Sequence, residues 1–318
     1  MTRLDRAVVF LVLIVVAALA LGRRETVFDP AGGRRPQPPM AAPETPLPLD
    51  SATPLPRGVP ASPGVVRPPL APTSPQRVRR PPLEAPAADD PVFEIDTETV
   101  KSGTVLLGTA FSVDDRGVWL TARHVASDVC GQVALVSGGR PVAASIAYQD
   151  AESDLAVLRT RGGAPAMPLA TDRPEVGETG YSFGFPTGVL GATRDSLLGR
   201  SRMQLGGRMT GTTPTLTWSE IRRFPDSLDT LGGMSGGPML DESGRVVGIL
   251  VAASVRRGRV HTVAPEVLSE AAQQTRLFDG AAPLPPVQEV ADASLELSTV
   301  ANELSGNSRI AKVYCRAR

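Results

Sequence analysis

Three side chains that together can cleave an amide bond occur along this chain of 318 residues, in the order histidine, aspartate, serine. His124 ends an apolar segment, Asp154 precedes another, and Ser235 lies in a glycine-rich turn. A serine hydroxyl is a weak nucleophile until a base within hydrogen-bond reach removes its proton, and that base needs an acid to orient it. Each residue alone has an ordinary structural explanation, as a histidine after a strand, a turn-capping aspartate or a loop serine. Their combination predicts nucleophilic catalysis.

The backbone around the serine fits a second requirement of this chemistry. The N–H groups of Gly233 and Ser235 can point together at the oxyanion that develops during attack on a carbonyl. Glycine at position 233 suits this arrangement, because a side chain would hinder the loop conformation. Histidine occurs only twice, at His124 and His261, so an imidazole base has to be one of these two residues.

Together, the three segments resemble those of the trypsin-like (chymotrypsin-fold) serine peptidases, and most closely the bacterial HtrA/Deg branch. The matching segments are Leu120-Thr-Ala-Arg-His124, Asp154-Leu-Ala-Val-Leu158 and Gly233-Met-Ser235-Gly-Gly-Pro238, and the resemblance covers about residues 100 to 277. It implies a serine endopeptidase in which Ser235 attacks, His124 transfers the proton and Asp154 orients the imidazole. It also implies protein or peptide substrates, and neither a metal nor an organic cofactor.

Strand-like segments dominate the chain from about residue 92 onward. Short β-type runs separated by glycine and polar turns are typical of an all-β sandwich or barrel. The expected strands cover residues 104–113, 117–121, 132–136, 141–148, 155–159, 179–184, 245–252 and 259–263. One helix is expected over residues 265–278, with Pro265 near its start. The family resemblance implies two six-stranded β-barrels, the catalytic residues in the cleft between them, and a C-terminal helix.

The sequence departs from the family pattern in two places. Met234 stands beside the nucleophile, where digestive relatives carry an aspartate that pairs with a newly formed N-terminus. Methionine cannot make that ion pair, so we expect switching by ordering of the loop over residues 232–235 rather than by propeptide cleavage. The residues after Phe278 are too few for the PDZ domain that HtrA relatives commonly add, and none is expected in this chain.

Two further residues are candidates for the substrate pocket. Asp229 lies six residues before Ser235, the spacing at which trypsin-type enzymes place the carboxylate that binds Arg or Lys. A solvated loop aspartate is the alternative interpretation. His261 is expected on a late strand near the pocket wall, where it either touches substrate or has a structural role.

The two cysteines exclude a disulfide-dense scaffold and a four-thiolate zinc site. Cys130 lies close to where many relatives of the family have a cystine beside the catalytic histidine. Its only possible partner within the chain is Cys315. We therefore expect either a disulfide between Cys130 and Cys315, which export would permit, or two free thiols.

The N-terminal sequence predicts a membrane anchor followed by a linker. Residues 7–21 are 15 consecutive apolar residues, and as a helix they span roughly 22 Å, short of the ~30 Å hydrocarbon core unless flanking residues contribute. We expect an uncleaved signal anchor, a transmembrane helix, over residues 1–22. The alternatives are a signal peptide cleaved at Ala18-Leu19-Ala20, which gives a secreted protein, and a buried core helix.

Residues 23–91 hold 19 of the 31 prolines, and this composition predicts a disordered linker. The expected organisation is therefore an anchor, this linker, a protease domain over residues 92–278 and a C-terminal tail over residues 279–318.

The charges exclude some partners but give little guidance on orientation. The 33 basic and 33 acidic residues cancel, which argues against nucleic-acid binding. Two arginines precede the apolar run and two follow it, so the positive-inside rule gives almost no preference. We expect a single-pass membrane protein with its protease domain in the periplasm; a cytoplasmic domain is the alternative. The competing functional hypothesis is a catalytically silent pseudoprotease that acts as a binding module of the cell envelope.

Overall fold

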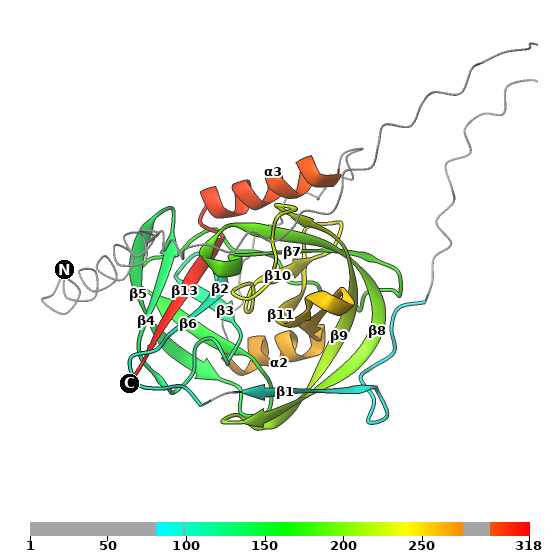
Figure 1. The fold of residues 1–318 in the computed structure, drawn as a ribbon, viewed down its shortest axis with the longest axis horizontal. Coiled ribbons are helices and arrows are strands. Elements are labelled where there is room, and N and C mark those ends of the chain that lie inside the picture. The colour runs from blue at the N-terminus through cyan, green and yellow to red at the C-terminus, as the bar shows by residue number, and fades with distance from the viewer. Residues whose placement is uncertain (1–80, 98, 276–292) are drawn as a thin grey trace, which may run out of the picture. The chain divides into compact units, whose positions relative to one another are not determined.

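The computed structural model of the chain describes residues 81–97, 99–275 and 293–318. These residues form a mostly β structure with two sheets and two α-helices (Figure 1). The first sheet is a closed six-stranded barrel in the order β13-β2-β3-β6-β5-β4. Its strands are β2 (Val105–Asp114), β3 (Val118–Thr121), β4 (Cys130–Ser137), β5 (Arg140–Gln149), β6 (Ala156–Thr160) and β13 (Ile310–Ala317).

Neighbouring strands of this barrel bring two of the candidate residues together. β3 and β6 are antiparallel, with Thr121 opposite Ala156, and β3 is buried throughout. His124 follows β3 and Asp154 precedes β6. Because the end of one strand lies beside the start of the other, the two residues meet at the same end of the barrel.

The sixth strand of the barrel comes from the far end of the chain. β13 is antiparallel to both β2 and β4, and Ile310 lies opposite Phe111. This corrects the expectation of a C-terminal tail over residues 279–318, because the described residues 293–318 form a helix and this strand. A short alternating segment indicates a strand but carries no signal of the distant sheet that it completes.

The second sheet has seven strands in the order β1-β8-β7-β10-β11-β12-β9. An additional pairing of β8 with β9 joins six of them into a cycle, and β1 lies parallel to β8 as an extra strand. The strands are β1 (Val92–Thr97), β7 (Thr179–Gly184), β8 (Gly191–Gly207), β9 (Gly211–Phe224), β10 (Pro238–Leu240), β11 (Val246–Ser254) and β12 (Arg259–Val263). The expectation of six-stranded sheets is therefore confirmed for the first barrel, whereas the second sheet has seven strands.

The two longest strands, β8 and β9, were not expected from the sequence. Arginine, serine, threonine and glycine interrupt the apolar pattern of β8, and about half of its residues are only partly buried. Tertiary pairing overrides weak strand propensity here, because β8 and β9 pair over most of their length. Their buried side chains, including Met203 and Trp218, help to form the core on this side of the molecule.

Two helices complete the described structure. α2 (Pro265–Thr275) follows β12 where a helix was expected. α3 (Ala293–Gly306) packs against β7, β8, β9 and β13 (Figure 1). It buries Leu297, Ala301 and Leu304, which share one face of the helix. The expected C-terminal helix is thus followed by a second helix and a strand.

The fold begins before the expected domain boundary at residue 92. Nε of Arg200 donates to Oδ1 of Asp90 at 2.9 Å, and the N–H of Leu83 donates to the carbonyl of Pro174 at 3.1 Å. Residues 81–91, which were expected to belong to a disordered linker, are therefore part of the described structure, because a proline-rich composition says nothing about partners offered by another strand. The rest of the expected linker lies outside the described residues.

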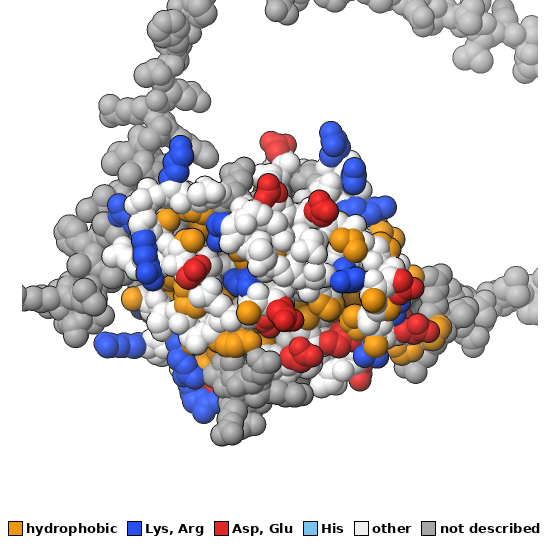
Figure 2. All heavy atoms as spheres, turned by 90° about the horizontal axis from the view of Figure 1, so that it is seen from below, with side chains coloured by type: hydrophobic (Ala, Val, Ile, Leu, Met, Phe, Trp, Pro, Cys, Tyr) orange, Lys and Arg blue, Asp and Glu red, His pale blue; other side chains and the backbone are white. Residues whose placement is uncertain are grey.

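Residues 1–80, which include the expected anchor, lie outside the described residues. Among the described residues, no helix is long and apolar enough to cross a membrane. On the face of the molecule shown in Figure 2, basic, acidic and hydrophobic side chains all occur, without a continuous field of one sign.

Candidate active site

His124 and Asp154 are joined by two hydrogen bonds. The backbone N–H of His124 donates to Oδ1 of Asp154 at 2.8 Å, and the ring nitrogen Nδ1 lies 2.6 Å from Oδ2. The side chain of Asp154 is 1% exposed, whereas that of His124 is 27% exposed. The carboxylate therefore holds Nδ1 and leaves Nε2 on the opposite edge of the ring, free for proton transfer.

The charge state of Asp154 suits its place beside a base. Burial alone would raise the pKa of this carboxyl group, but the charge of His124 and the hydrogen bonds to it outweigh burial, and the pKa is lowered. An ionised carboxylate in this position stabilises the imidazolium that forms when the histidine accepts a proton.

Arg123 secures the turn before the aspartate, a role that the sequence reasoning missed. Its Nη1 donates to the carbonyls of Asp150 at 2.6 Å and Ala151 at 2.7 Å, and its Nη2 donates to the carbonyl of Thr210 at 3.0 Å. The three carbonyls belong to two different loops. Arg123 thus joins the turn that precedes Asp154 to the turn between β8 and β9.

Ser235 lies in the turn before β10, and a threonine of the first barrel holds that turn. The N–H of Thr109 donates to the carbonyl of Ser235 at 2.8 Å, and its hydroxyl donates to the carbonyl of Gly233 at 2.8 Å. Thr109 is completely buried. The sequence offered no signal for this role beyond the position of Thr109 within the residues that the family resemblance covers.

The peptide group between Gly232 and Gly233 has a defined orientation. The N–H of Thr187 donates to the carbonyl of Gly232 at 2.8 Å. Because a trans peptide is planar, the N–H of Gly233 points away from that carbonyl. Gly233 has a φ of 103°, a value that glycine adopts without strain. Within the described residues, the N–H groups of Gly233 and Ser235 form no hydrogen bond, so both are available to an oxyanion.

The segments that carry the histidine and the serine meet over β2. A Cβ atom on Gly108 would lie 2.3 Å from a methyl group of Val125 and 3.0 Å from the carbonyl oxygen of Ser235. Within the described residues, no hydrogen bond joins the Ser235 hydroxyl to His124. In enzymes without substrate this contact is often long and tightens only when the substrate binds.

A cavity of about 570 Å³ opens beside His124. β10 pairs with β11 as far as Ile249, and the backbone of Leu250 still forms hydrogen bonds with Gly236 and Gly237. Only the residues of β11 after Leu250 therefore have one free edge in the described structure. An extended peptide can add to such an edge as a further strand. The cavity is lined by Ile95, Asp96, Thr97, Thr99, Val100, Lys101, Thr104, Leu106, His124, Arg208, Val251, Ala252 and Ala253.

Neither candidate pocket residue lines this cavity. Asp229 is exposed in the loop between β9 and β10, not enclosed at the floor of a pocket. His261 is stacked on Phe93, with ring centroids 3.9 Å apart, and its Nδ1 lies 3.1 Å from the hydroxyl of Thr217. Burial, with a smaller effect of Arg259, lowers the pKa of His261 to about 4. These contacts give His261 a packing role at the place where β1 joins the second sheet.

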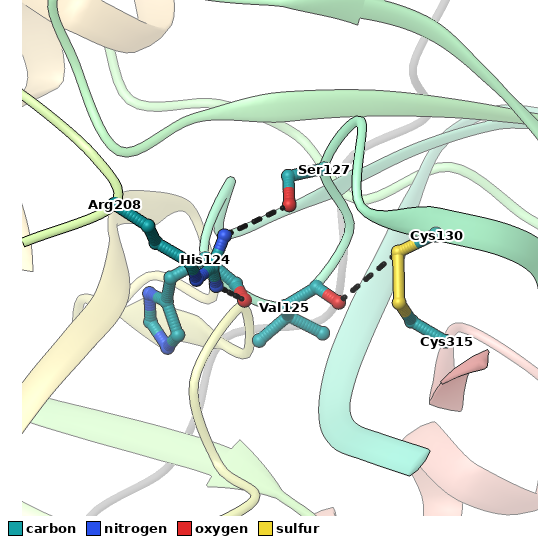
Figure 3. The surroundings of a disulfide bond; sticks show 6 residues. All are labelled: His124, Val125, Ser127, Cys130, Arg208 and Cys315. Carbon is teal, nitrogen blue, oxygen red and sulfur yellow. Dashed lines mark hydrogen bonds between the residues drawn. A yellow bond between two sulfur atoms is a disulfide. The ribbon is translucent and has the colours of Figure 1, made fainter. Parts of the chain in front are cut away.

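Cys130 and Cys315 form a disulfide. It links the loop after His124 to β13, which is 185 residues away in sequence. Figure 3 shows the disulfide on one side of this loop and Arg208 on the other. Among residues 81–97, 99–275 and 293–318, no group of three or more histidine, cysteine or acidic side chains is placed to hold a metal ion.

Comparisons with known proteins found similar proteases. Residues 108–249 match the family model of the trypsin-like peptidase domain. The putative serine protease HhoA of Synechocystis is 27% identical over 187 residues, covering 56% of this chain and 45% of the relative. The serine endoprotease DegS of Salmonella typhimurium is 30% identical over 147 residues, covering 45% and 38%. Among solved structures, the active form of the Rv3671c protease from M. tuberculosis has a TM-score of 0.45 and 20% identity, and the match covers 65% of this chain and 96% of that one.

The similarity to trypsin-like and HtrA-type proteases that the three motifs predicted is therefore confirmed. His124, Asp154 and Ser235 all lie within the matched residues 108–249. The matches span less than half the length of these two curated relatives.

Proposed function

From the similarity of residues 108–249 to trypsin-like peptidases, we propose that the protein is a serine endopeptidase that hydrolyses proteins or peptides through an acyl-enzyme intermediate. The observation that carries the proposal is the pairing of His124 with a buried, ionised Asp154 in the same fold as the glycine turn that presents Ser235. Two backbone N–H groups of that turn form no hydrogen bond within the described part of the chain and can donate to the oxyanion.

The proposed reaction has two halves, formation of the acyl-enzyme and its hydrolysis, and each of these groups acts in both. Nε2 of His124 takes the hydroxyl proton while Oγ of Ser235 attacks the scissile carbonyl, and the N–H groups of Gly233 and Ser235 stabilise the oxyanion. Asp154 stabilises the imidazolium. His124 then gives the proton to the leaving amine, and water repeats the sequence to release the acyl group.

A fluorophosphonate probe, which reacts with activated serines, tests the assignment. Ser235→Ala is expected to abolish both labelling and peptide hydrolysis while the melting temperature stays unchanged. Ser227→Ala, which removes an exposed hydroxyl from the same connection between β9 and β10, is the matched control and should keep both. Labelling that persists in Ser235→Ala would contradict the assignment. Absence of labelling in the wild-type chain would favour the binding-module hypothesis.

We also propose that the N-terminal segment tethers the peptidase domain to the membrane and that the domain lies outside the cytoplasm, in the periplasm. The support is the 15-residue apolar run over residues 7–21, the proline-rich stretch behind it and the disulfide, because disulfides persist in oxidising compartments. Carbonate extraction and a compartment-specific reporter fused after Arg318 test the two statements separately. Release of the intact chain by carbonate would contradict the tether, and a reporter active only in the cytoplasm would contradict the location.

A further inference from the structure

A side chain from the second sheet holds the loop that carries the proposed general base. Arg208 lies in the turn between β8 and β9. Its Nη2 donates to the carbonyl oxygen of His124 at 3.0 Å, and its Nη1 donates to Oγ of Ser127 at 3.1 Å (Figure 3). One guanidinium therefore binds two residues of the same loop, in charge-assisted hydrogen bonds, which are the stronger kind.

His124 is held through three of its atoms, and Arg208 supplies one of these contacts. The N–H and the ring nitrogen both bind Asp154, and the carbonyl binds Arg208. Contacts to a single carboxylate leave the loop free to pivot about it. The far end of the loop is fixed by the disulfide of Cys130 with Cys315. Arg208 fixes the end that carries the ring.

The backbone of Arg208 is in turn held by the last residue of β1. The N–H of Arg208 donates to the carbonyl of Thr97 at 3.1 Å. The Thr97 hydroxyl donates to the carbonyl of Gly206 at 2.5 Å and accepts from the N–H of Met209 at 2.9 Å. A Cβ atom on Gly207 would lie 2.2 Å from the carbonyl oxygen of Thr97, so the turn fits closely against β1. Thr97 thus holds the residues on both sides of Arg208.

We propose that Arg208 is a positioning residue for His124, and that Thr97 keeps Arg208 in place, so that the attachment of β1 to the second sheet is transmitted to the general base. This inference rests on the proposed serine peptidase function. Because Arg208 also lines the cavity beside His124, direct contact with substrate is the competing role, and it would act on KM rather than on kcat.

The test compares kcat and KM of the full chain with those of Arg208→Met, with the concentration of active enzyme set by fluorophosphonate titration. We expect kcat to fall about tenfold with KM unchanged, because a displacement of a catalytic group by about 1 Å costs up to 100-fold in rate. Arg208→Lys should recover much of the loss, since its ammonium group can still donate to the carbonyl. Arg202→Met is the matched control: this arginine of β8 donates to the carbonyl of Ala88 and should leave kcat unchanged.

Thr97→Val tests the second half of the proposal, because valine keeps the shape of threonine but cannot make its hydroxyl hydrogen bonds. We expect a smaller loss in kcat than for Arg208→Met. Combining the two substitutions should add almost no further loss, because the effects of substitutions that act through the same contacts are not additive. Thr171→Val, at an exposed position that does not line the cavity, is the control and should leave kcat unchanged. Fully additive losses would overturn the link between Thr97 and Arg208.

An NMR readout does not depend on turnover. The resonance of the proton between Nδ1 of His124 and Asp154 should shift or broaden in Arg208→Met and stay unchanged in Arg202→Met. An unchanged kcat in Arg208→Met, a rise in KM alone, or a lower melting temperature with unchanged kcat per titrated site would each overturn the positioning role. If labelling of the wild-type chain does not depend on Ser235, the proposed function fails instead, and the resonance still tests the positioning of His124.

Discussion

The two sheets hold their parts of the proposed active site by different means. In the first barrel, His124 is fixed by side-chain hydrogen bonds to a buried carboxylate. In the second sheet, the turn with Ser235 is fixed by glycine conformations and mainly by backbone hydrogen bonds, to which the Thr109 hydroxyl adds one side-chain hydrogen bond. The geometry of the histidine therefore depends on which side chains are present, whereas that of the serine depends mainly on which backbone angles are allowed.

The sheets also differ in how the first and the last strand of the described structure join them. β13, near the C-terminus, completes the first barrel and pairs on both sides, with β2 and β4. β1, far earlier in the chain, joins the second sheet and, among the strands that the structure describes, pairs only with β8. Loss of β13 would open a closed barrel, while loss of β1 would leave a closed cycle of six strands. We therefore expect the first barrel to depend more strongly on its terminal strand.

The largest effect is expected from deleting β13. Removal of residues 307–318 should abolish cooperative thermal unfolding, because it exposes the edges of β2 and β4 and leaves Cys130 without a partner. Removal of residues 1–97 should leave a folded protein with a lower melting temperature. Circular dichroism during heating measures both. Equal losses of thermal stability in the two deletions would contradict the difference expected between β13 and β1.

The disulfide should contribute strongly to the stability of the first barrel. Replacing both cysteines, Cys130→Ser with Cys315→Ser, is expected to lower the free energy of unfolding by about 2–5 kcal/mol, because the bond closes a long loop in the unfolded chain. Urea titration of the variant and of the reduced wild-type protein measures the loss. The two should agree; a loss well below this range would show that β13 is held by strand pairing alone.

Gly233→Ala should damage the serine turn far more than the same change at its neighbour. At Gly233, φ is 103° and a Cβ atom would lie 2.6 Å from the carbonyl oxygen of Phe185. We expect kcat to fall about 10²–10³-fold, as for the loss of one oxyanion donor. At Gly232 the nearest atom would be 3.4 Å away, so Gly232→Ala is the matched control and should stay close to wild type. Similar activity in both variants would contradict the dependence on backbone angles.

The pH dependence of stability should show the effect of protonating His261 in the second sheet. Its folded pKa of about 4 lies below the ordinary value of 6.5, so only the unfolded chain takes up a proton between these values. The stabilisation is complete above about pH 6.5 and is lost as the pH falls towards 4, by at most about 3 kcal/mol, and less because the ring is partly exposed. His261→Phe should flatten this part of the stability curve in urea titrations. If the pH dependence of stability is unchanged in this variant, groups other than His261 cause it.

Most of the first barrel was predictable, whereas much of the second sheet was not. β2 to β6 are short runs with a clear apolar pattern between turn residues, and each lies within a few residues of an expected strand. β8 and β9 carry polar residues along their length, so only their pairing with each other makes them strands. Asp229 was placed by its spacing from Ser235 and His261 by its position on an expected strand, and neither feature determines which way a loop or a strand faces.

By itself, the sequence determined the resemblance to trypsin-like peptidases, the candidate triad of His124, Asp154 and Ser235, and the identity of the only possible cysteine pair. Nucleophilic catalysis restricts residue type and order so strongly that three short segments suffice to indicate it.

Only the tertiary structure decided that the last strand closes the first barrel, that Thr109 holds the serine turn, and that Arg208 binds the histidine loop. Each of these is a hydrogen bond or a strand pairing between residues far apart in the chain. A pattern of neighbouring residues records which side chains can make such contacts, but the packing of the whole fold decides which of them are made.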